Sequence, residues 1–90
     1  MKNYDLQNMI PNKLKECRVK AGMTQFDVML KLGVRSTDRI SKWERGTKYP
    51  NVVNLLRLAQ IYNVLPGELY PEINQEFLDS QKLPEDLPHE

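Results

Sequence analysis

Cysteine and histidine are scarce in this 90-residue sequence, which holds one of each, Cys17 and His89. A single cysteine cannot form an internal disulfide, which fits a protein of the reducing cytoplasm. Structural zinc needs about four ligands, so we expect no metal and no other cofactor. No run of about eighteen apolar residues is present, so no membrane span is predicted. Residues 1–10 also lack the basic start and apolar stretch of a secretion signal.

Groups arranged for catalysis are missing as well. His89 and Ser80 have no partners that would suggest a triad or an acid–base pair. There is no glycine-rich phosphate loop, and no pair of carboxylates falls in a recognisable pocket. Cys17 lies in an apolar stripe, which favours a buried, inert thiol over a redox sensor. The sequence is therefore not expected to be an enzyme, and no small-molecule substrate is evident.

Charge is abundant but unevenly distributed. Residues 1–50 hold eleven lysines and arginines against five acidic residues, whereas residues 51–90 hold two against seven. The net charges of the two parts are therefore +6 and −5, although the whole chain carries only +1. This polarity is typical of a basic face turned toward a polyanion. In a small protein it is equally compatible with a chance imbalance.

Apolar residues recur at helical spacing through most of the chain, and no strand pattern competes with them. We expect an all-α, compact fold of five helices over about 12–20, 24–32, 36–45, 52–62 and 66–70. The expected caps are Asn12, Thr24, Ser36 and Asn51 at the helix starts, with Gly22, Gly33, Gly46 and Asn63 at the ends. Pro66 suits the first position of the fifth helix. The residues expected to face the core are Ile10, Leu14, Cys17, Ala21, Val28, Met29, Leu32, Ile40, Trp43, Val52, Leu55, Leu56, Ala59 and Tyr62.

The chain is expected to form one domain with two flanking segments. Residues 1–11 form an N-terminal arm, and residues 12–70 form the domain. Residues 71–90 form an extension, in which 72–80 have the pattern of one more helix. The last ten residues hold two prolines and are expected to be disordered.

The second and third helices are the informative pair, because both are short and only Gly33, Val34 and Arg35 separate them. Glycine supplies the positive φ that a tight turn between crossed helices needs. Val34 is expected to fill the gap between the helices, which leaves the outer face of the third helix free. An exposed helix fits the major groove of DNA, which is about 12 Å wide. A solvated polar face is the competing interpretation of the same pattern.

The ordered set of these segments resembles the phage Cro/repressor-type helix-turn-helix domain over about residues 12–70. The segments that carry the resemblance are Thr24-Gln25, Leu32-Gly33-Val34, Ile40-Ser41-Lys42-Trp43-Glu44-Arg45-Gly46, Pro50-Asn51 and Leu55-Leu56-Arg57-Leu58-Ala59. The resemblance implies a lambda-repressor-like fold. It also implies a transcriptional regulator that binds double-stranded DNA sequence-specifically, with the third helix in the major groove.

Residue roles follow from the resemblance. Base reading is expected from Thr37, Asp38, Ser41 and Lys42. Phosphate contacts are expected from Gln25, Arg35, Arg39, Arg45, Thr47 and Lys48. Arg18 and Glu44 hold the places of a structural ion pair.

Two departures from the family pattern affect these roles. The turn before the third helix is one residue longer than usual, which leaves Thr37 and Arg39 as competing base readers. Asp38 is unusual on a DNA-facing helix. It can accept from a cytosine amino group, but a role at the helix N-terminus or a pair with Arg35 is favoured.

Helix-turn-helix proteins often bind palindromic sites as dimers, with half-sites one helical turn apart. We expect a homodimer on a palindromic operator, formed through Leu65, Leu69, Tyr70, Ile73 and Phe77. The alternative function is a protein-interaction module, or the antitoxin of a toxin–antitoxin pair, in which the acidic end holds a basic partner.

Overall fold

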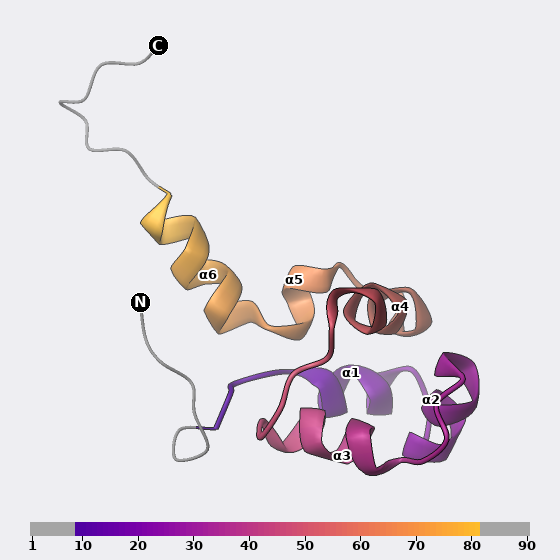
Figure 1. Cartoon of the computed structure of the whole chain (residues 1–90). Helices are drawn as coiled ribbons and strands as arrows, with labels where there is room; N and C mark the ends of the chain where they lie inside the picture. The colour runs from indigo at the N-terminus through magenta and orange to yellow at the C-terminus, as the bar shows by residue number, and fades with distance from the viewer. Residues whose placement is uncertain (1–8, 82–90) are drawn as a thin grey trace, which may run out of the picture.

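The fold contains six helices in residues 9–81, which are the residues that the computed structural model describes (Figure 1). They are α1 (Leu14–Lys20), α2 (Gln25–Leu32), α3 (Asp38–Arg45), α4 (Val52–Tyr62), α5 (Pro66–Leu69) and α6 (Pro71–Ser80). No strand occurs within this part of the chain. The expected all-α fold is confirmed, and the helical pattern at 72–80 belongs to a sixth helix. The expected N-terminal arm lies mostly outside the described residues, as does the tail expected to be disordered.

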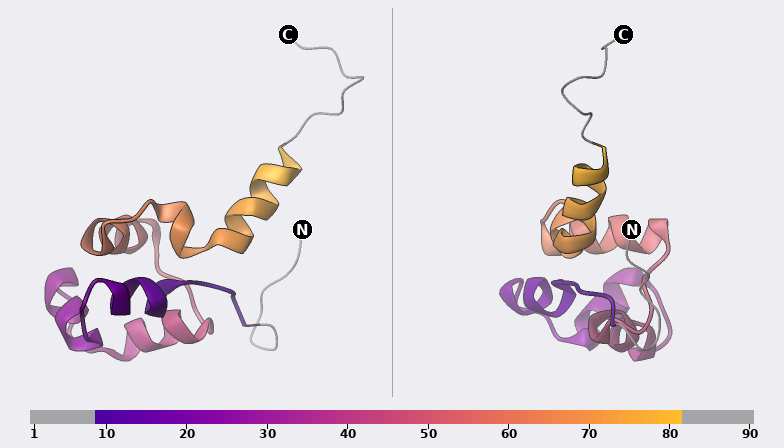
Figure 2. Two further views of the ribbon diagram at one scale, coloured as in Figure 1. Left: turned by 180° about the vertical axis from the view of Figure 1, so that it is seen from behind. Right: turned by 90° about the vertical axis from the view of Figure 1, so that its left-hand side faces the viewer.

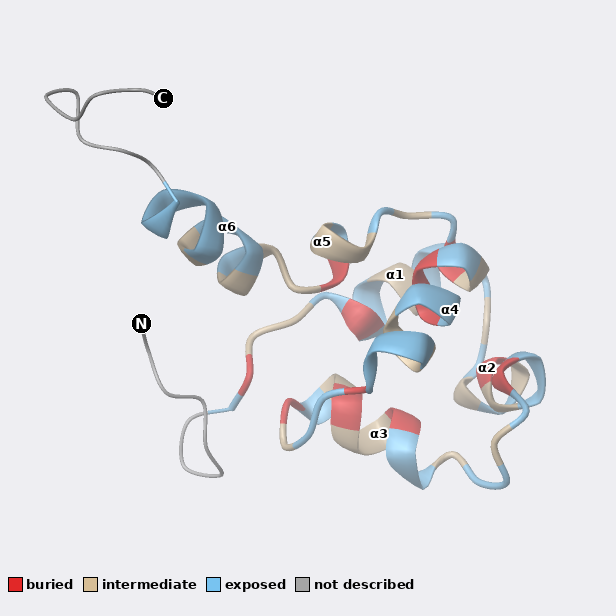
Figure 3. Cartoon of the chain, turned by 45° about the horizontal axis from the view of Figure 1, so that its top comes forward, coloured by how far each residue is buried: buried red, intermediate tan, exposed pale blue. Residues whose placement is uncertain are grey.

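One apolar core joins the first five helices (Figure 3). Its residues with almost no exposed surface are Leu14, Val28, Ile40, Leu58 and Leu69. Each of these comes from a different helix, so each helix is held by burial of its apolar side. Trp43 is also buried, and this confirms its expected place in the core.

Helices α2 and α4 each begin with a side-chain cap. The hydroxyl of Thr24 accepts from the backbone N–H of Asp27 at 3.1 Å, and the Asp27 carboxylate accepts from the N–H of Thr24 at 2.8 Å. The side chain of Asn51 accepts from the N–H of Asn54 at 2.8 Å. Asn63 ends α4 with φ of 57°. The caps at Thr24, Asn51 and Asn63 are those expected from the sequence. The expected cap Asn12 is not the N-cap residue of α1, because the residue before α1 is Lys13, which makes no side-chain cap.

The apolar face of α4 differs from the expected one. Val52 and Leu56 are 70% and 48% exposed, whereas Leu58, which was not expected to face the core, is buried. The cause is that α4 packs against α1, α2 and α5 at once, so its buried side is set by three neighbours.

Two residues at α1 are also less buried than expected, because Ala21 is exposed and Cys17 is only half-buried. Burial raises the pKa of the Cys17 thiol.

Helix α6 extends away from the body of the domain (Figure 2). None of its residues is buried, and α5 is the helix it contacts most. Across residues 9–81, no helix has the length and apolar character that would let it cross a bilayer.

Candidate functional site

The turn between α2 and α3 has the expected geometry. Gly33 has φ of 76°, and the half-buried side chain of Val34 packs against the core. The start of α3 differs from the prediction, since the helix begins at Asp38 and Thr37 is the residue before it. The hydroxyl of Ser36 accepts from the N–H of Asp38 at 3.3 Å, so Ser36 supports the start without being the cap residue itself. The longer turn therefore moves Thr37 off the first helical turn.

Helix α3 has an apolar side and a polar side that face in opposite directions. Ile40 and Trp43 are buried against the core. At about 100° per residue, the opposite side carries the residues Asp38, Ser41, Lys42 and Arg45. All four are exposed or half-buried. Figure 1 shows α3 at the edge of the body, with its outer side free of other described elements.

The side chains on this outer side already interact with one another. The Lys42 ammonium lies 3.0 Å from a carboxylate oxygen of Asp38. The guanidinium of Arg45 donates to the backbone carbonyl of Ser41 at 3.4 Å. The favoured pairing of Asp38 with Arg35 is thus replaced by a pairing one helical turn further on. The i,i+4 spacing places the carboxylate N-terminal to the ammonium, which is the better order on a helix.

A polar recess of about 320 Å³ lies between α3 and the segment that follows it. Asp38, Arg39 and Lys42 line one wall, and Lys48 lines the other. Arg39 also borders a second recess, which Arg35 shares. The expected cations therefore surround the exposed side of α3. The lining residues that the sequence analysis missed are Tyr49, Asn51 and Asn54, which carry no signal beyond their position after α3.

The carboxyl end of α3 is fixed by the chain on both sides of it. The backbone N–H and the hydroxyl of Thr47 both donate to the Lys42 carbonyl, at 3.1 and 3.2 Å. The hydroxyl hydrogen of Thr47 is thus already used within the chain. The side-chain amide of Asn12 donates to the carbonyls of Trp43 and Glu44, at 3.2 and 3.3 Å. The segment before α1 therefore braces the end of α3.

Arg18 and Glu44 lie together, as the family pattern pairs them. Two nitrogens of Arg18 donate to the two carboxylate oxygens of Glu44, at 2.6 and 3.2 Å. The Arg18 and Glu44 side chains are 12% and 6% exposed, so the pair is well shielded from water. Its hydrogen bond to Glu44 raises the pKa of Arg18 above its ordinary value. The amide of Gln25 donates to the same carboxylate at 3.0 Å, so one of its two N–H groups is occupied.

The residues expected at a dimer interface do not share one surface. Leu69 has no exposed surface and belongs to the core, so its expected role at an interface is wrong. Leu69 is the buried residue of the short helix α5, and its side chain packs that helix against the core. Leu65 and Phe77 are 72% and 53% exposed.

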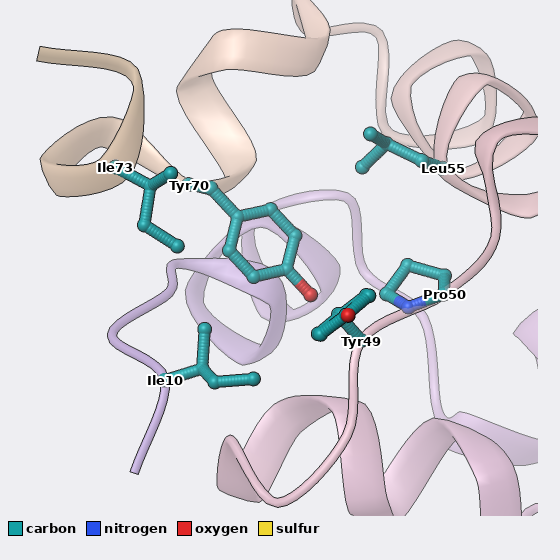
Figure 4. Close-up of a pocket in the computed structure, with 6 residues that line it drawn as sticks. All are labelled: Ile10, Tyr49, Pro50, Leu55, Tyr70 and Ile73. Atoms are coloured by element: carbon teal, nitrogen blue, oxygen red, sulfur yellow. The ribbon is translucent and has the colours of Figure 1, made fainter. Parts of the chain in front are cut away.

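Tyr70 and Ile73 line an apolar recess of about 340 Å³ near the root of α6 (Figure 4). Ile10, Tyr49 and Pro50 contribute to its walls. The Tyr70 hydroxyl points toward Tyr49 and Pro50, and it is buried without a hydrogen-bond partner in the described residues. Burial raises the pKa of Tyr70 well above its ordinary value. A buried hydroxyl without a partner is costly, so this recess is a place where a polar atom would be stabilising.

Comparison with known proteins agrees with this geometry. The family model described as "Helix-turn-helix domain" matches residues 12–74, which is more than two thirds of the chain. The chain is also 40% identical over 52 residues to a protein of Bacillus subtilis (strain 168) named "HTH-type transcriptional regulator ImmR". That match includes 58% of this chain and spans only 40% of the relative's length. The chain belongs to the helix-turn-helix domain family, of the Cro/repressor type.

Proposed function

We propose that this protein binds double-stranded DNA sequence-specifically and regulates transcription, with α3 in the major groove. The observation that carries the proposal is the exposed polar side of α3, with Arg39, Lys48 and Arg35 around it. Phosphate contacts supply most of the affinity of such proteins, and contacts with base edges supply the specificity. The name of the Bacillus relative supports the same function.

The contacts divide into two kinds by their place around α3. Ser41, Lys42 and Asp38 are proposed to face base edges, because they lie on the outer side of the helix. Thr37 precedes the first turn of α3, so we propose that it contributes less to base reading than these three residues. The proposed phosphate contacts flank the helix and are Gln25, Arg35, Arg39, Arg45 and Lys48. Thr47 would join them only by turning its hydroxyl away from the Lys42 carbonyl. Gln25 still has one free amide N–H, near the positive end of the α2 dipole.

Selection of binding sites from random duplexes, followed by titrations with substituted proteins, tests the proposal. Lys42→Ala is expected to cost about 1–3 kcal/mol on the selected site and to relax one base position. Lys48→Ala is expected to weaken all sequences alike and to lower the salt slope by about one. The two variants separate base reading from phosphate binding.

Lys20→Ala is the matched control, because it removes one exposed charge at the end of α1, in a recess shared with Tyr62 and Glu68 and not with α3. It is expected to leave DNA affinity nearly unchanged. A wild-type protein that prefers no duplex over any other at moderate salt would contradict the proposed function. It would favour a protein-interaction role for the same surface.

We also propose that the protein binds a palindromic operator as a homodimer through α6. A helix of ten residues with no buried side chain is marginal by itself in water, so it needs packing from outside the described chain. Ile73 and Phe77 share one side of this helix, and Glu72, Glu76 and Asp79 form an acidic stripe beside it. The apolar side adjoins the recess beside Tyr70. Two copies related by a two-fold axis would cover both apolar surfaces at once.

A further inference from the structure

The ion pair between Asp38 and Lys42 stands on the side of α3 that is proposed to face DNA. The two side chains are 64% and 39% exposed, and both line the polar recess beside the helix. A carboxylate in this place is unfavourable for DNA binding in general, because it faces phosphates of the same sign. Attraction to DNA therefore does not explain why the Asp38 carboxylate lies on this side of α3.

The hydrogen-bonding groups of this pair are complementary to those on the major-groove edge of a base pair. An ammonium group only donates hydrogen bonds, and a carboxylate only accepts them. In the major groove, a G·C pair presents two acceptors on guanine, N7 and O6, next to the N4 amino donor of cytosine. Guanine O6 and cytosine N4 are joined by a hydrogen bond of about 2.9 Å. Lys42 and Asp38 present a donor and an acceptor 3.0 Å apart.

We infer that Asp38 and Lys42 act as one unit that reads a G·C base pair, with Lys42 donating to guanine and Asp38 accepting from cytosine N4. This inference rests on the proposed function and names the base pair that the same surface recognises. An A·T pair fits less well. Adenine offers an ammonium one acceptor, N7, beside its N6 donor, whereas guanine offers two, N7 and O6. The other acceptor of an A·T pair, thymine O4, lies next to the thymine methyl group.

The unit contributes more to discrimination than to affinity. The Asp38 carboxylate partly cancels the Lys42 charge, so the pair adds little attraction to an arbitrary sequence. A surface i,i+4 pair is weak, so both side chains can turn toward the bases at small cost. Only a site that donates to the carboxylate compensates for its repulsion from the phosphates.

Binding-site selection with Asp38→Ala, Lys42→Ala and the double variant tests the inference. Wild-type protein is expected to select a half-site that contains a G·C pair. Each single variant is expected to weaken the preference at that same pair by about tenfold. The double variant is expected to lose little more, because the two residues share one contact. Asp38→Ala is also expected to bind random DNA a few-fold more tightly.

A modified base gives a second measurement that does not depend on selection. N4-methylcytosine at the identified position keeps base pairing but blocks the amino hydrogen that faces the groove. It is expected to weaken wild-type binding about tenfold and to leave Asp38→Ala unaffected. Glu72→Ala, which removes an exposed acidic residue on α6, is the charge-matched control and should respond like wild type.

The outcomes separate the inference from the proposed function. A wild-type consensus that both substitutions leave unchanged would overturn the inference while the proposed function stands. So would effects at two different base pairs, an A·T pair at the shared position, or equal sensitivity of Asp38→Ala to the methylated base. Absence of any wild-type consensus would overturn the proposed function and the inference together. Thermal unfolding of each variant checks that it is folded.

Discussion

At the scale of single residues, Gly46 is the glycine whose added Cβ would meet backbone atoms of another segment. Its φ is 80°, and a Cβ at this position would lie 2.5 Å from the carbonyl oxygen of Ile10. The backbone N–H of Ile10 donates to the Gly46 carbonyl at 2.8 Å, so the contact is also a hydrogen bond that holds the two segments together. The close approach fixes the end of α3 against the segment before α1.

Gly46→Ala is therefore expected to lower the free energy of unfolding by at least about 2 kcal/mol, from the left-handed φ and the contact with Ile10 together. Gly22→Ala is the matched control. Gly22 has φ of 72° but nothing within 4 Å of the added Cβ, so about 1 kcal/mol is expected. Urea unfolding measures both. Equal losses for the two variants would show that the contact with Ile10 has no energetic weight.

A second residue-scale prediction concerns Asp27. Its hydrogen bonds with the backbone and the side chain of Thr24 lower the pKa of Asp27 below its ordinary value of 3.8. Because the folded pKa is below the unfolded one, the stabilisation is present above about pH 4 and is lost as the pH falls through the folded pKa. Asp27→Asn is expected to be less stable at neutral pH and to lose part of the stability change seen on acidification. Unfolding curves from pH 6 to pH 2 test this, and parallel profiles for both proteins would contradict it.

Single-residue roles were predictable where a local rule fixes them, and less so where a distant neighbour does. Thr24 and Asn51 cap helices through atoms three residues away, so their roles follow from short-range sequence. The second partner of Glu44 did not follow in this way, since Gln25 reaches it only because the fold brings the start of α2 beside Glu44. Leu69 was expected on the surface. Its helix has only four residues, which is too short for apolar spacing to show which side is buried.

At the scale of elements, the existence of each helix was predictable and its orientation less so. Apolar periodicity identified α1 to α5, because each buries one side against a shared core. The exposed positions Val52 and Leu56 show the limit of that rule. Periodicity gives an apolar stripe, but the neighbours that pack on a helix select which part of the stripe is buried. The start of α3 also depends on a turn whose extra residue has no fixed place in the family pattern.

Helix α3 is stabilised by contacts with three other parts of the chain, and these contacts explain how so short a helix can present its outer face. Its end is closed by Gly46 and Thr47, while Asn12 accounts for two of its terminal carbonyls. Glu44 ties it to α1 through Arg18. Eight residues alone would be marginal as a helix. The surrounding contacts, rather than helix propensity, therefore determine how well its outer side chains are placed.

At the scale of the whole molecule, charge and apolar surface separate along the chain. Arg35, Arg39, Lys42, Arg45 and Lys48 lie on or beside α3, whereas α6 carries three acidic residues and no basic one. An acidic α6 is poorly suited to lie along DNA, so its apolar side is available for protein contact. The exposed Phe77 lies one helical turn beyond Ile73, which lines the recess at the root of the helix. In an antiparallel pair of α6 helices, Phe77 of each copy would lie opposite Ile73 of the other.

Phe77→Asp is therefore expected to convert a homodimer into a monomer without unfolding the domain, because no residue of α6 is buried. Light scattering at fixed protein concentration measures the mass. On a palindromic operator the variant is expected to lose cooperative binding, while its affinity for an isolated half-site stays within about twofold of wild type. Phe26→Asp is the matched control, since Phe26 is 57% exposed on α2 and lies outside this surface. A wild-type protein that is monomeric both free and on the operator would contradict the dimer. A Phe77→Asp variant that keeps full cooperativity would place the interface elsewhere than α6.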